Sequence, residues 1–215
     1  MTDTELSLRE RQLVALAAAA AAEPLDDRLD DAAHDAVASG ALTVEELLEA
    51  VLHVAVYAGW PRASHLEMVL GQQWARVHAE RGEDPAPWPE LEPDDRTTGA
   101  DRRAAGLARF EEVNGFPSPP CDTPYRQAVV EWVFGDLWWR PGLSRRDRRL
   151  ISITCVALTG APFPLAIHVG TALTSGDLSE TAMEQVVEVL TPYCSPTRAA
   201  ALAAALTQAA DQVSG

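Results

Sequence analysis

The sequence predicts an all-α fold made of two tandem copies of one helical unit, packed together as an internal pseudo-dimer. Nearly all periodic segments repeat their apolar residues at helical spacing, and no run of alternating β-branched residues is long enough for a sheet. In addition, motifs from the start of the chain recur about 137 residues later, which is the sign of an internal repeat.

The first copy is expected to contain four helices. Capping-box patterns, in which a Ser or Thr precedes a Glu by three residues, begin at Ser7 and Thr43, and each precedes a run of helical periodicity. Gly40 is placed to end the helix before it. The expected helices cover about 7–22, 25–39, 43–57 and 62–80.

A linker is expected between the copies. Residues 81–99 are rich in Pro, Asp and Glu, a composition typical of linkers. We therefore divide the chain into a first copy over 1–80, this linker, and a second copy over 100–215. Expected helices in the second copy cover about 101–113 and 125–138, followed by one capped at Ser144 and one that carries His168 and runs to about 175.

The repeat is visible at two places. Residues 6–13 read LSLRERQL and residues 143–150 read LSRRDRRL, an offset of 137. Residues 39–43 (SGALT) and 175–179 (SGDLS) match at an offset of 136, so one inserted or deleted residue aligns both pairs. Each copy alone is too small for a generous core, so the copies are expected to pack against each other.

Composition excludes several partners. The net charge of −15 disfavours nucleic acid and anionic membrane surfaces, because both repel an acidic protein. No stretch approaches the roughly 18 apolar residues of a membrane span, and the polar start is not that of a signal peptide. We therefore expect a cytoplasmic protein that does not bind membranes.

Residue usage also excludes several kinds of chemistry. All 17 basic residues are Arg, so reactions through a Lys imine, including those of pyridoxal phosphate, are excluded, as is the phosphate loop with its Lys. Cys121, Cys155 and Cys194 form no C-x-x-C pair and are expected to be ordinary reduced thiols. Glu49 and His53 have metal-ligand spacing, but no second cluster accompanies them, so no metal and no cofactor are expected.

Two segments resemble the carboxymuconolactone decarboxylase family. Residues 134–145 read FGDLWWRPGLSR, which is similar to the family signature W-G-D-I-W-x-R-P-G-L-x-R, and residues 165–168 resemble the end of its E-L-x-x-H segment. In the first copy, residues 49–61 resemble the family's helix end E-x₇-Y-x-G-x-P. The resemblance implies the helical unit shared with the alkylhydroperoxidases, and cofactor-free decarboxylation.

The thiol peroxidase activity of that wider superfamily is excluded. Those peroxidases carry C-x-x-C followed four residues later by His; when the sequence is aligned on His168, the two Cys positions are occupied by Ala161 and Pro164, and the family's acidic position by Arg149. Without a thiol pair there is no couple that could reduce a peroxide.

The two copies retain different halves of the pattern. The second copy keeps His168, but Pro164 replaces the family Glu and Gln185 stands where the first copy has Glu49. The first copy keeps the Y-x-G-x-P ending, but Ala32 stands where the second copy has His168. We infer one composite site per chain, built from the second half of copy one and the first half of copy two. The alternative is a pair of degenerate copies without a site.

Three residues of the first copy are candidates for this site. Glu49, His53 and Tyr57 are spaced by four residues and therefore share one helix face. Glu49 is expected to orient His53 and to raise its pKa, which would prepare His53 to donate a proton, while Tyr57 would contact substrate. The alternative is that Glu49 is a solvated surface acid and Tyr57 a core residue.

His168 is the main catalytic candidate of the second copy. It follows an apolar segment near the start of a helix, a place where a lone His is usually structural. The family resemblance assigns it instead a role as proton donor, or as the group that polarises a carbonyl.

An Arg-rich turn of the second copy favours an anionic ligand; it contains Arg140, Arg145, Arg146, Arg148 and Arg149. Arg140 and Arg149 are retained in the family pattern and are expected to bind a small carboxylate-bearing substrate. The alternative is that the arginines of this turn pair with acids across interfaces. Trp138 and Trp139 are expected to form walls that strip water from the departing carboxylate.

The leading function is thus decarboxylation of a carboxylated unsaturated lactone or related carbonyl compound. One alternative is another proton-transfer reaction on the same fold, such as cyclisation, dehydration or isomerisation, and a second is a non-catalytic binding or scaffold protein. Because relatives with a single repeat form rings, the resemblance also implies a homo-oligomer, in which three tandem chains would equal a hexamer.

Overall fold

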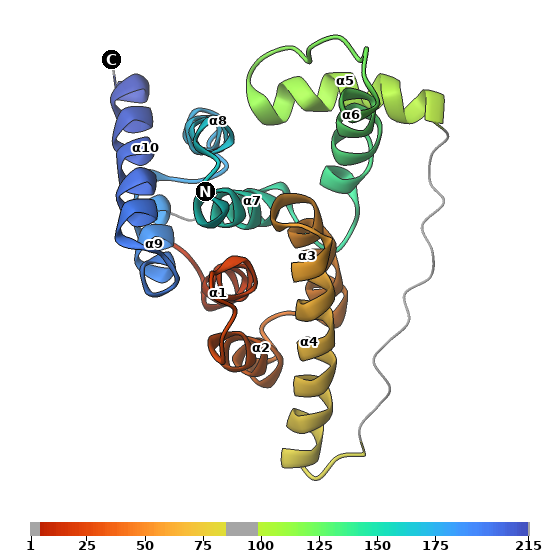
Figure 1. The fold of residues 1–215 in the computed structure, drawn as a ribbon, viewed down its shortest axis with the longest axis vertical. Helices are drawn as coiled ribbons and strands as arrows, with labels where there is room; N and C mark the ends of the chain where they lie inside the picture. The colour runs from red at the N-terminus through yellow and green to blue at the C-terminus, as the bar shows by residue number, and fades with distance from the viewer. Residues whose placement is uncertain (1–4, 85–98, 215) are drawn as a thin grey trace.

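The computed structural model describes residues 5–84 and 99–214, and every regular element within these ranges is a helix. The all-α prediction is confirmed. The first copy contains α1 (Leu8–Ala21), α2 (Arg28–Ser39), α3 (Val44–Ala58) and α4 (Trp60–Glu80) (Figure 1). The second copy ends with α7 (Arg145–Thr159), α8 (Pro162–Thr174), α9 (Glu180–Leu190), the 3₁₀ turn η3 (Thr191–Tyr193) and α10 (Pro196–Ser214). Between them lie α5 (Gly99–Asn114), α6 (Pro124–Ala128), the π-helix η1 (Val129–Phe134) and the 3₁₀ turn η2 (Leu137–Trp139).

The capping signals of the sequence are confirmed. Ser7, Thr43 and Ser144 each accept a hydrogen bond from the backbone N–H three residues later, and the acid at that position bonds back to the cap. Most of the predicted linker, residues 85–98, lies outside the described residues. No helix in the described part of the chain has the length and apolarity that a membrane crossing needs.

The prediction of one continuous helix over 125–138 is wrong. This segment forms α6, η1 and η2 in succession, and η1 crosses α5 at direct backbone contact. A Cβ atom placed on Gly106 would lie 1.9 Å from the carbonyl oxygen of Val130, and one on Gly135 would lie 2.5 Å from that of Arg102. The two glycines therefore permit a crossing that no side chain would allow, and the π-helical turns lie at this crossing.

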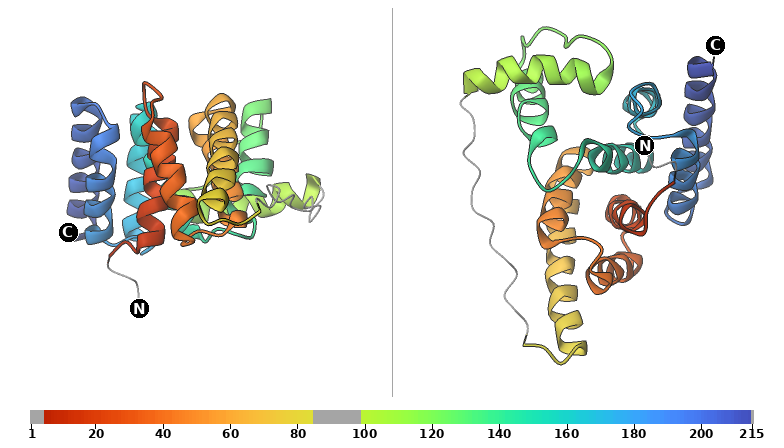
Figure 2. Two further views of the ribbon diagram at one scale, coloured as in Figure 1. Left: turned by 90° about the horizontal axis from the view of Figure 1, so that it is seen from below. Right: turned by 180° about the vertical axis from the view of Figure 1, so that it is seen from behind.

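The two copies are related by a pseudo-twofold axis. Helices α1 to α4 correspond in order to α7 to α10, and α1 packs on α9 as α7 packs on α3 (Figures 1 and 2). Arg9 binds Asp147 at 2.6 Å, and the corresponding residue Arg146 binds Glu10. Such reciprocal contacts are the property of a twofold interface, here within one chain.

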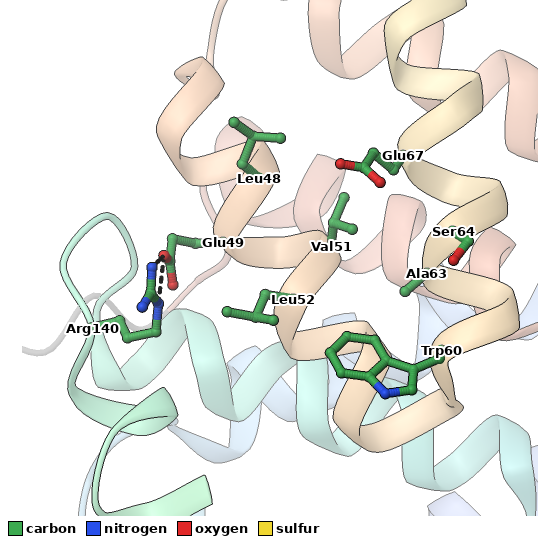
Figure 3. Close-up of a pocket in the computed structure, with 9 residues that line it drawn as sticks. All are labelled: Leu48, Glu49, Val51, Leu52, Trp60, Ala63, Ser64, Glu67 and Arg140. Atoms are coloured by element: carbon green, nitrogen blue, oxygen red, sulfur yellow. Dashed lines mark hydrogen bonds and ion pairs between the residues drawn. The ribbon is translucent and has the colours of Figure 1, made fainter. Parts of the chain in front are cut away.

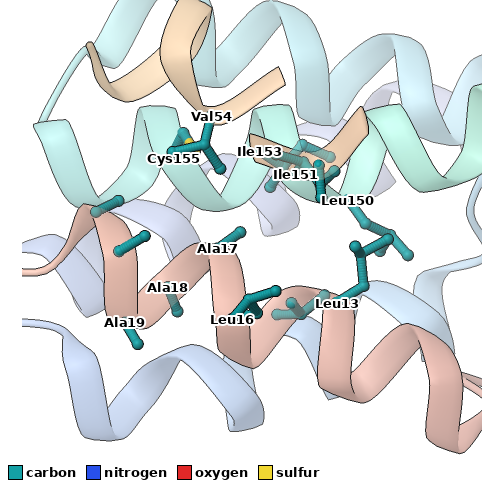
Figure 4. Close-up of a cluster of buried hydrophobic side chains, with 14 of the residues drawn as sticks. Leu13, Leu16, Ala17, Ala18, Ala19, Val54, Leu150, Ile151, Ile153 and Cys155 are labelled. Atoms are coloured by element: carbon teal, nitrogen blue, oxygen red, sulfur yellow. The ribbon is translucent and has the colours of Figure 1, made fainter. Parts of the chain in front are cut away.

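The core lies where α1 and α7 meet. The Ala-rich face of α1, with Ala17 and Ala18, is buried against the larger side chains of α7, among them Ile151 and Cys155 (Figure 4). Because the Ala side chains are short, the two helix backbones approach closely. This contact fixes α7 relative to the first copy, and so places its polar residues beside α3.

A second, smaller core joins α5, η1 and η2. Phe110, Val113, Phe134 and Trp138 are buried together, and Tyr57 of α3 packs against them. This cluster brings the Trp138 ring from the irregular segment against the helices of both copies.

Candidate active site

One group of the site is a carboxylate with two guanidinium partners, which we call the Glu49 cluster. Glu49 on α3 is 3% exposed, and its Oε1 accepts a hydrogen bond from Arg140 Nε at 2.8 Å (Figure 3). Its Oε2 accepts one from Arg148 Nη2 at 3.2 Å. Glu49 is therefore neither solvated nor turned toward His53. Glu49 and Arg140 also line a pocket of about 350 Å³ between α3 and α4.

Arg148 has hydrogen-bonding capacity that the described residues do not use. Its side chain is fully buried, and Nη2 serves Glu49 and the backbone oxygen of Arg140 at 2.8 Å. Nε and Nη1 are buried and have no hydrogen-bond partner within residues 5–84 and 99–214. Because a buried donor without an acceptor is costly, these atoms would be stabilised by a carboxylate oxygen.

The second group is a set of rings from both copies, buried except for the half-buried Tyr57, which we call the aromatic cluster: His53, Tyr57, Trp138, His168 and the guanidinium of Arg149. The rings of His53 and Tyr57 stack at 4.9 Å, and the ring of His168 lies 5.4 Å from Tyr57. Trp138 stacks on His168 at 6.0 Å, with Arg149 at 5.2 Å on the Trp138 ring. Residues separated by more than 100 positions thus form one contiguous site.

Ser152 of α7 connects the polar atoms on the α3 side of this cluster. Its Oγ lies 2.9 Å from His53 Nε2 and also hydrogen-bonds with the hydroxyl of Tyr57. The same Tyr57 hydroxyl accepts a hydrogen bond from Trp138 Nε1 at 2.9 Å. His53, Ser152 and Tyr57 therefore form a path along which a proton can move.

Arg149 fixes the tautomer of His168. Its Nε binds Asp177 Oδ2 at 3.2 Å, its Nη2 donates to the backbone oxygen of Val113 at 2.6 Å, and its Nη1 lies 3.2 Å from His168 Nδ1. Because a guanidinium can only donate, His168 Nδ1 is the acceptor. The proton of the neutral His168 ring is therefore on Nε2.

The two histidines are uncharged at neutral pH. Burial and the positive charge of Arg149 lower the pKa of His168 from 6.5 to about 3. Burial and the charge of Arg148 lower the pKa of His53 well below its usual value, so the prediction of a raised His53 pKa is wrong. The reason is that the Glu49 carboxylate faces the arginines. In contrast, burial raises the pKa of Tyr57 to about 12, so Tyr57 keeps its proton.

Comparison with known proteins shows to which family this chain belongs. The sequence model of the carboxymuconolactone decarboxylase family matches residues 1–70 and 124–208, which is more than half of the chain. The chain belongs to the carboxymuconolactone decarboxylase family. The two matched segments correspond to the two copies of the helical unit. This family member is also 29% identical over 79 residues to a nitrosuccinic acid decarboxylase of Metarhizium robertsii, covering 35% of the chain and 55% of that relative. The chain thus spans about half the length of this curated relative.

In the structure of this family member, five of the eight predicted site residues lie together in the aromatic cluster. Glu49 and Arg140 form an ion pair of their own, one helical turn from His53. Trp139 packs against the smaller core, with the Arg109 guanidinium 4.8 Å from its ring. Arg140 pairs with Glu49 across the two copies, as the alternative interpretation of the Arg-rich turn predicted, whereas Arg149 pairs with Asp177 within the second copy.

Three contributors were not predicted from the sequence of the family member: Arg148, Ser152 and Asp177. Two of them had a signal in the sequence: Arg148 belongs to the Arg-rich turn that favours an anionic ligand, and Ser152 is polar at the centre of the apolar run of α7. Among residues 5–84 and 99–214, no group of three or more His, Cys, Asp or Glu side chains could hold a metal ion.

The low histidine pKa values predict acid sensitivity. Because the pKa of His168 is lowered from 6.5 to about 3 in the folded state, the unfolded chain binds more protons in that interval. The resulting stability is complete above pH 6.5 and is lost as the pH falls toward 3. Between pH 7.5 and pH 5 we expect His168 alone to lower the unfolding free energy by about 2 kcal/mol.

Urea unfolding at a series of pH values measures this loss. In the His168→Gln variant, which has no ring to protonate, the pH dependence should shrink by the same amount. An unchanged pH dependence in the variant would show that His168 is not held neutral by the fold.

Proposed function

We propose that the protein is a cofactor-independent decarboxylase of a small acid whose carbanion is stabilised by a neighbouring electron acceptor. The substrate class is a carboxylated unsaturated lactone, or a related carbonyl or nitro compound. The observation that carries the proposal is the aromatic cluster: a proton-bearing hydroxyl, an N–H donor and a guanidinium from both copies converge away from water.

The substrate carboxylate binds at Arg148 in this proposal. Nε and Nη1 of Arg148 are unused, and Nη2 donates to Glu49, which also lines the pocket in Figure 3. An entering carboxylate would replace Glu49 on Arg148 and Arg140, because both arginines bind any carboxylate in the same manner. The Glu49 carboxylate then acts as a resident competitor of the substrate.

Carbon dioxide leaves once the carboxylate is stripped of water. The bond between the carboxylate carbon and its neighbour breaks, and its electron pair moves through that neighbour onto the acceptor oxygen. The Nε2–H of His168 donates a hydrogen bond to this oxygen, and the charge of Arg149, 3.2 Å from Nδ1, stabilises the resulting anion.

Tyr57 supplies the proton that ends the reaction. The carbanion carbon takes the hydroxyl proton, and the tyrosinate is stabilised by the N–H of Trp138 at 2.9 Å. A solvent proton returns to Tyr57 through Ser152 and His53. The reaction thus consumes one proton and releases one carbon dioxide.

The relative from Metarhizium robertsii supports the wider substrate class. Its name gives nitrosuccinic acid as substrate, in which a nitro group takes the place of the lactone carbonyl as electron acceptor. Loss of a carboxylate beside either group leaves negative charge on an oxygen atom. The hydrogen-bond donor at His168 suits both oxygens.

Carbon dioxide release from a panel of acids tests the proposal. The panel contains γ-carboxymuconolactone, nitrosuccinate and, as the control without an acceptor, succinate. We expect release from at least one acid that carries an acceptor and none from succinate. Conversion without carbon dioxide would favour a cyclase, dehydratase or isomerase, and absence of both turnover and binding across the panel would favour a scaffold protein.

A further inference from the structure

A pocket in the first copy lies at the pseudo-twofold counterpart of the candidate active site. It has a volume of about 280 Å³ and lies between α1, α2 and the end of α9 with η3. The active-site elements α7, α8 and α3 correspond to α1, α2 and α9. Its lining residues are Arg11, Gln12, Ala15, Asp31, Ala32, Asp35, Val189 and Tyr193.

Smaller side chains create this space. Val189 stands 136 residues after His53, and Ala32 stands 136 residues before His168. Ala15 and Gln12 stand 137 residues before Ser152 and Arg149. Each replacement shortens the side chain, so the volume that the aromatic cluster fills in one half of the molecule is a cavity in the other.

Two features of the active site persist in this pocket. Tyr193 corresponds to Tyr57, and Arg11 corresponds to Arg148. The Arg11 side chain is half-buried and makes no hydrogen bond or ion pair with any residue that the structure describes. It is available for a carboxylate, as the unused donors of Arg148 are.

The opposite wall differs from the active site in charge. Asp31 and Asp35 of α2 line it together with Tyr193. Burial raises the pKa of the Tyr193 hydroxyl, the charge of Arg28, whose guanidinium lies 5.1 Å from the Tyr193 ring, lowers it, and the charges of Asp31 and Asp35 raise it. Both carboxylates are exposed, and Asp35 Oδ1 lies 3.8 Å from His34 Nδ1. The lining thus carries two carboxylates and one guanidinium, a balance that repels a dicarboxylate and favours a ligand that carries both an anionic and a cationic group.

We propose that this pocket binds a small zwitterion of the α-amino acid type. The ligand carboxylate is bound by Arg11, and its ammonium group is bound by Asp31 and Asp35. An aliphatic side chain lies against Ala15, Ala32 and Val189, the apolar part of the lining. The site needs none of the residues of the aromatic cluster, so it stands or falls independently of the decarboxylase proposal.

An NMR titration of backbone amides with L-leucine tests this site. Isocaproate, which lacks the amino group, and isoamylamine, which lacks the carboxylate, are the matched probes. We expect L-leucine to shift the amides of Gln12, Ala32 and Val189, with both probes binding about tenfold more weakly, because each loses one charge-assisted contact.

Three variants of the full chain complete the test. Arg11→Gln and Asp31→Asn should each raise the Kd for L-leucine about tenfold, while Arg76→Gln, on an exposed part of α4, should leave it unchanged. Thermal unfolding establishes that each variant is folded. The proposal is overturned if L-leucine shifts none of these amides, if isocaproate binds as tightly as L-leucine, or if neither pocket variant changes the Kd.

Discussion

The Tyr57→Phe variant is expected to lose about two to four orders of magnitude in kcat for carbon dioxide release. The change removes one oxygen atom, and with it the proton donor that Trp138 and Ser152 hold in place. KM should change little, because the carboxylate is bound by Arg148. Steady-state carbon dioxide release with the best acid of the panel measures both constants.

The matched control is Tyr125→Phe. Tyr125 is 77% exposed and lies outside the aromatic cluster, so its hydroxyl should not affect kcat. A loss of less than threefold in Tyr57→Phe, on a chain shown to be folded, would remove Tyr57 from the role of proton donor.

The Glu49→Gln variant is expected to lose about 3 kcal/mol of unfolding free energy. It leaves the buried guanidinium of Arg148 without an opposing charge, whereas the wild type offers it a carboxylate oxygen at 3.2 Å. For a chain of this length the loss corresponds to a fall in Tm of about 9 °C. In addition, KM for a carboxylate substrate should fall, because the resident competitor has lost its charge.

Glu45→Gln is the control for this variant. Glu45 lies one turn earlier on α3 and is exposed, so its loss should cost less than about 0.5 kcal/mol. Equal stability of both variants in urea unfolding would mean that the Glu49 cluster does not stabilise the fold. An unchanged KM in Glu49→Gln would contradict the exchange of carboxylates.

Local signals in the sequence predict most of the fold. The capping residues Ser7, Thr43 and Ser144 begin their helices as expected, because a hydroxyl that accepts a backbone N–H needs no distant partner. The prediction of one continuous helix over 125–138 is wrong for the opposite reason. Its form depends on the crossing with α5 at Gly106, a contact between residues far apart in the sequence.

In the candidate site too, local sequence predicts some features, and contacts between distant residues decide the others. The spacing of Glu49, His53 and Tyr57 places them on one helix face, but spacing cannot say which neighbour each side chain meets. Glu49 was expected to raise the pKa of His53. Instead, its carboxylate accepts hydrogen bonds from two arginines of the second copy. Whether His53 is protonated thus depends on tertiary contacts and burial, neither of which the local sequence specifies.

The central claim is that residues from both copies form one catalytic site, and a kinetic double-mutant cycle tests it most directly. His53→Gln changes the first copy and His168→Gln the second, and kcat/KM is measured for each single variant and for the double variant. We predict that each single variant loses about 100-fold in kcat/KM and that the double variant is within about tenfold of the less active single variant, because both residues serve the same turnover: His168 stabilises the acceptor oxygen and His53 returns the proton to Tyr57. If instead each single variant keeps about half of the wild-type turnover, as two independent sites would, the composite site is contradicted.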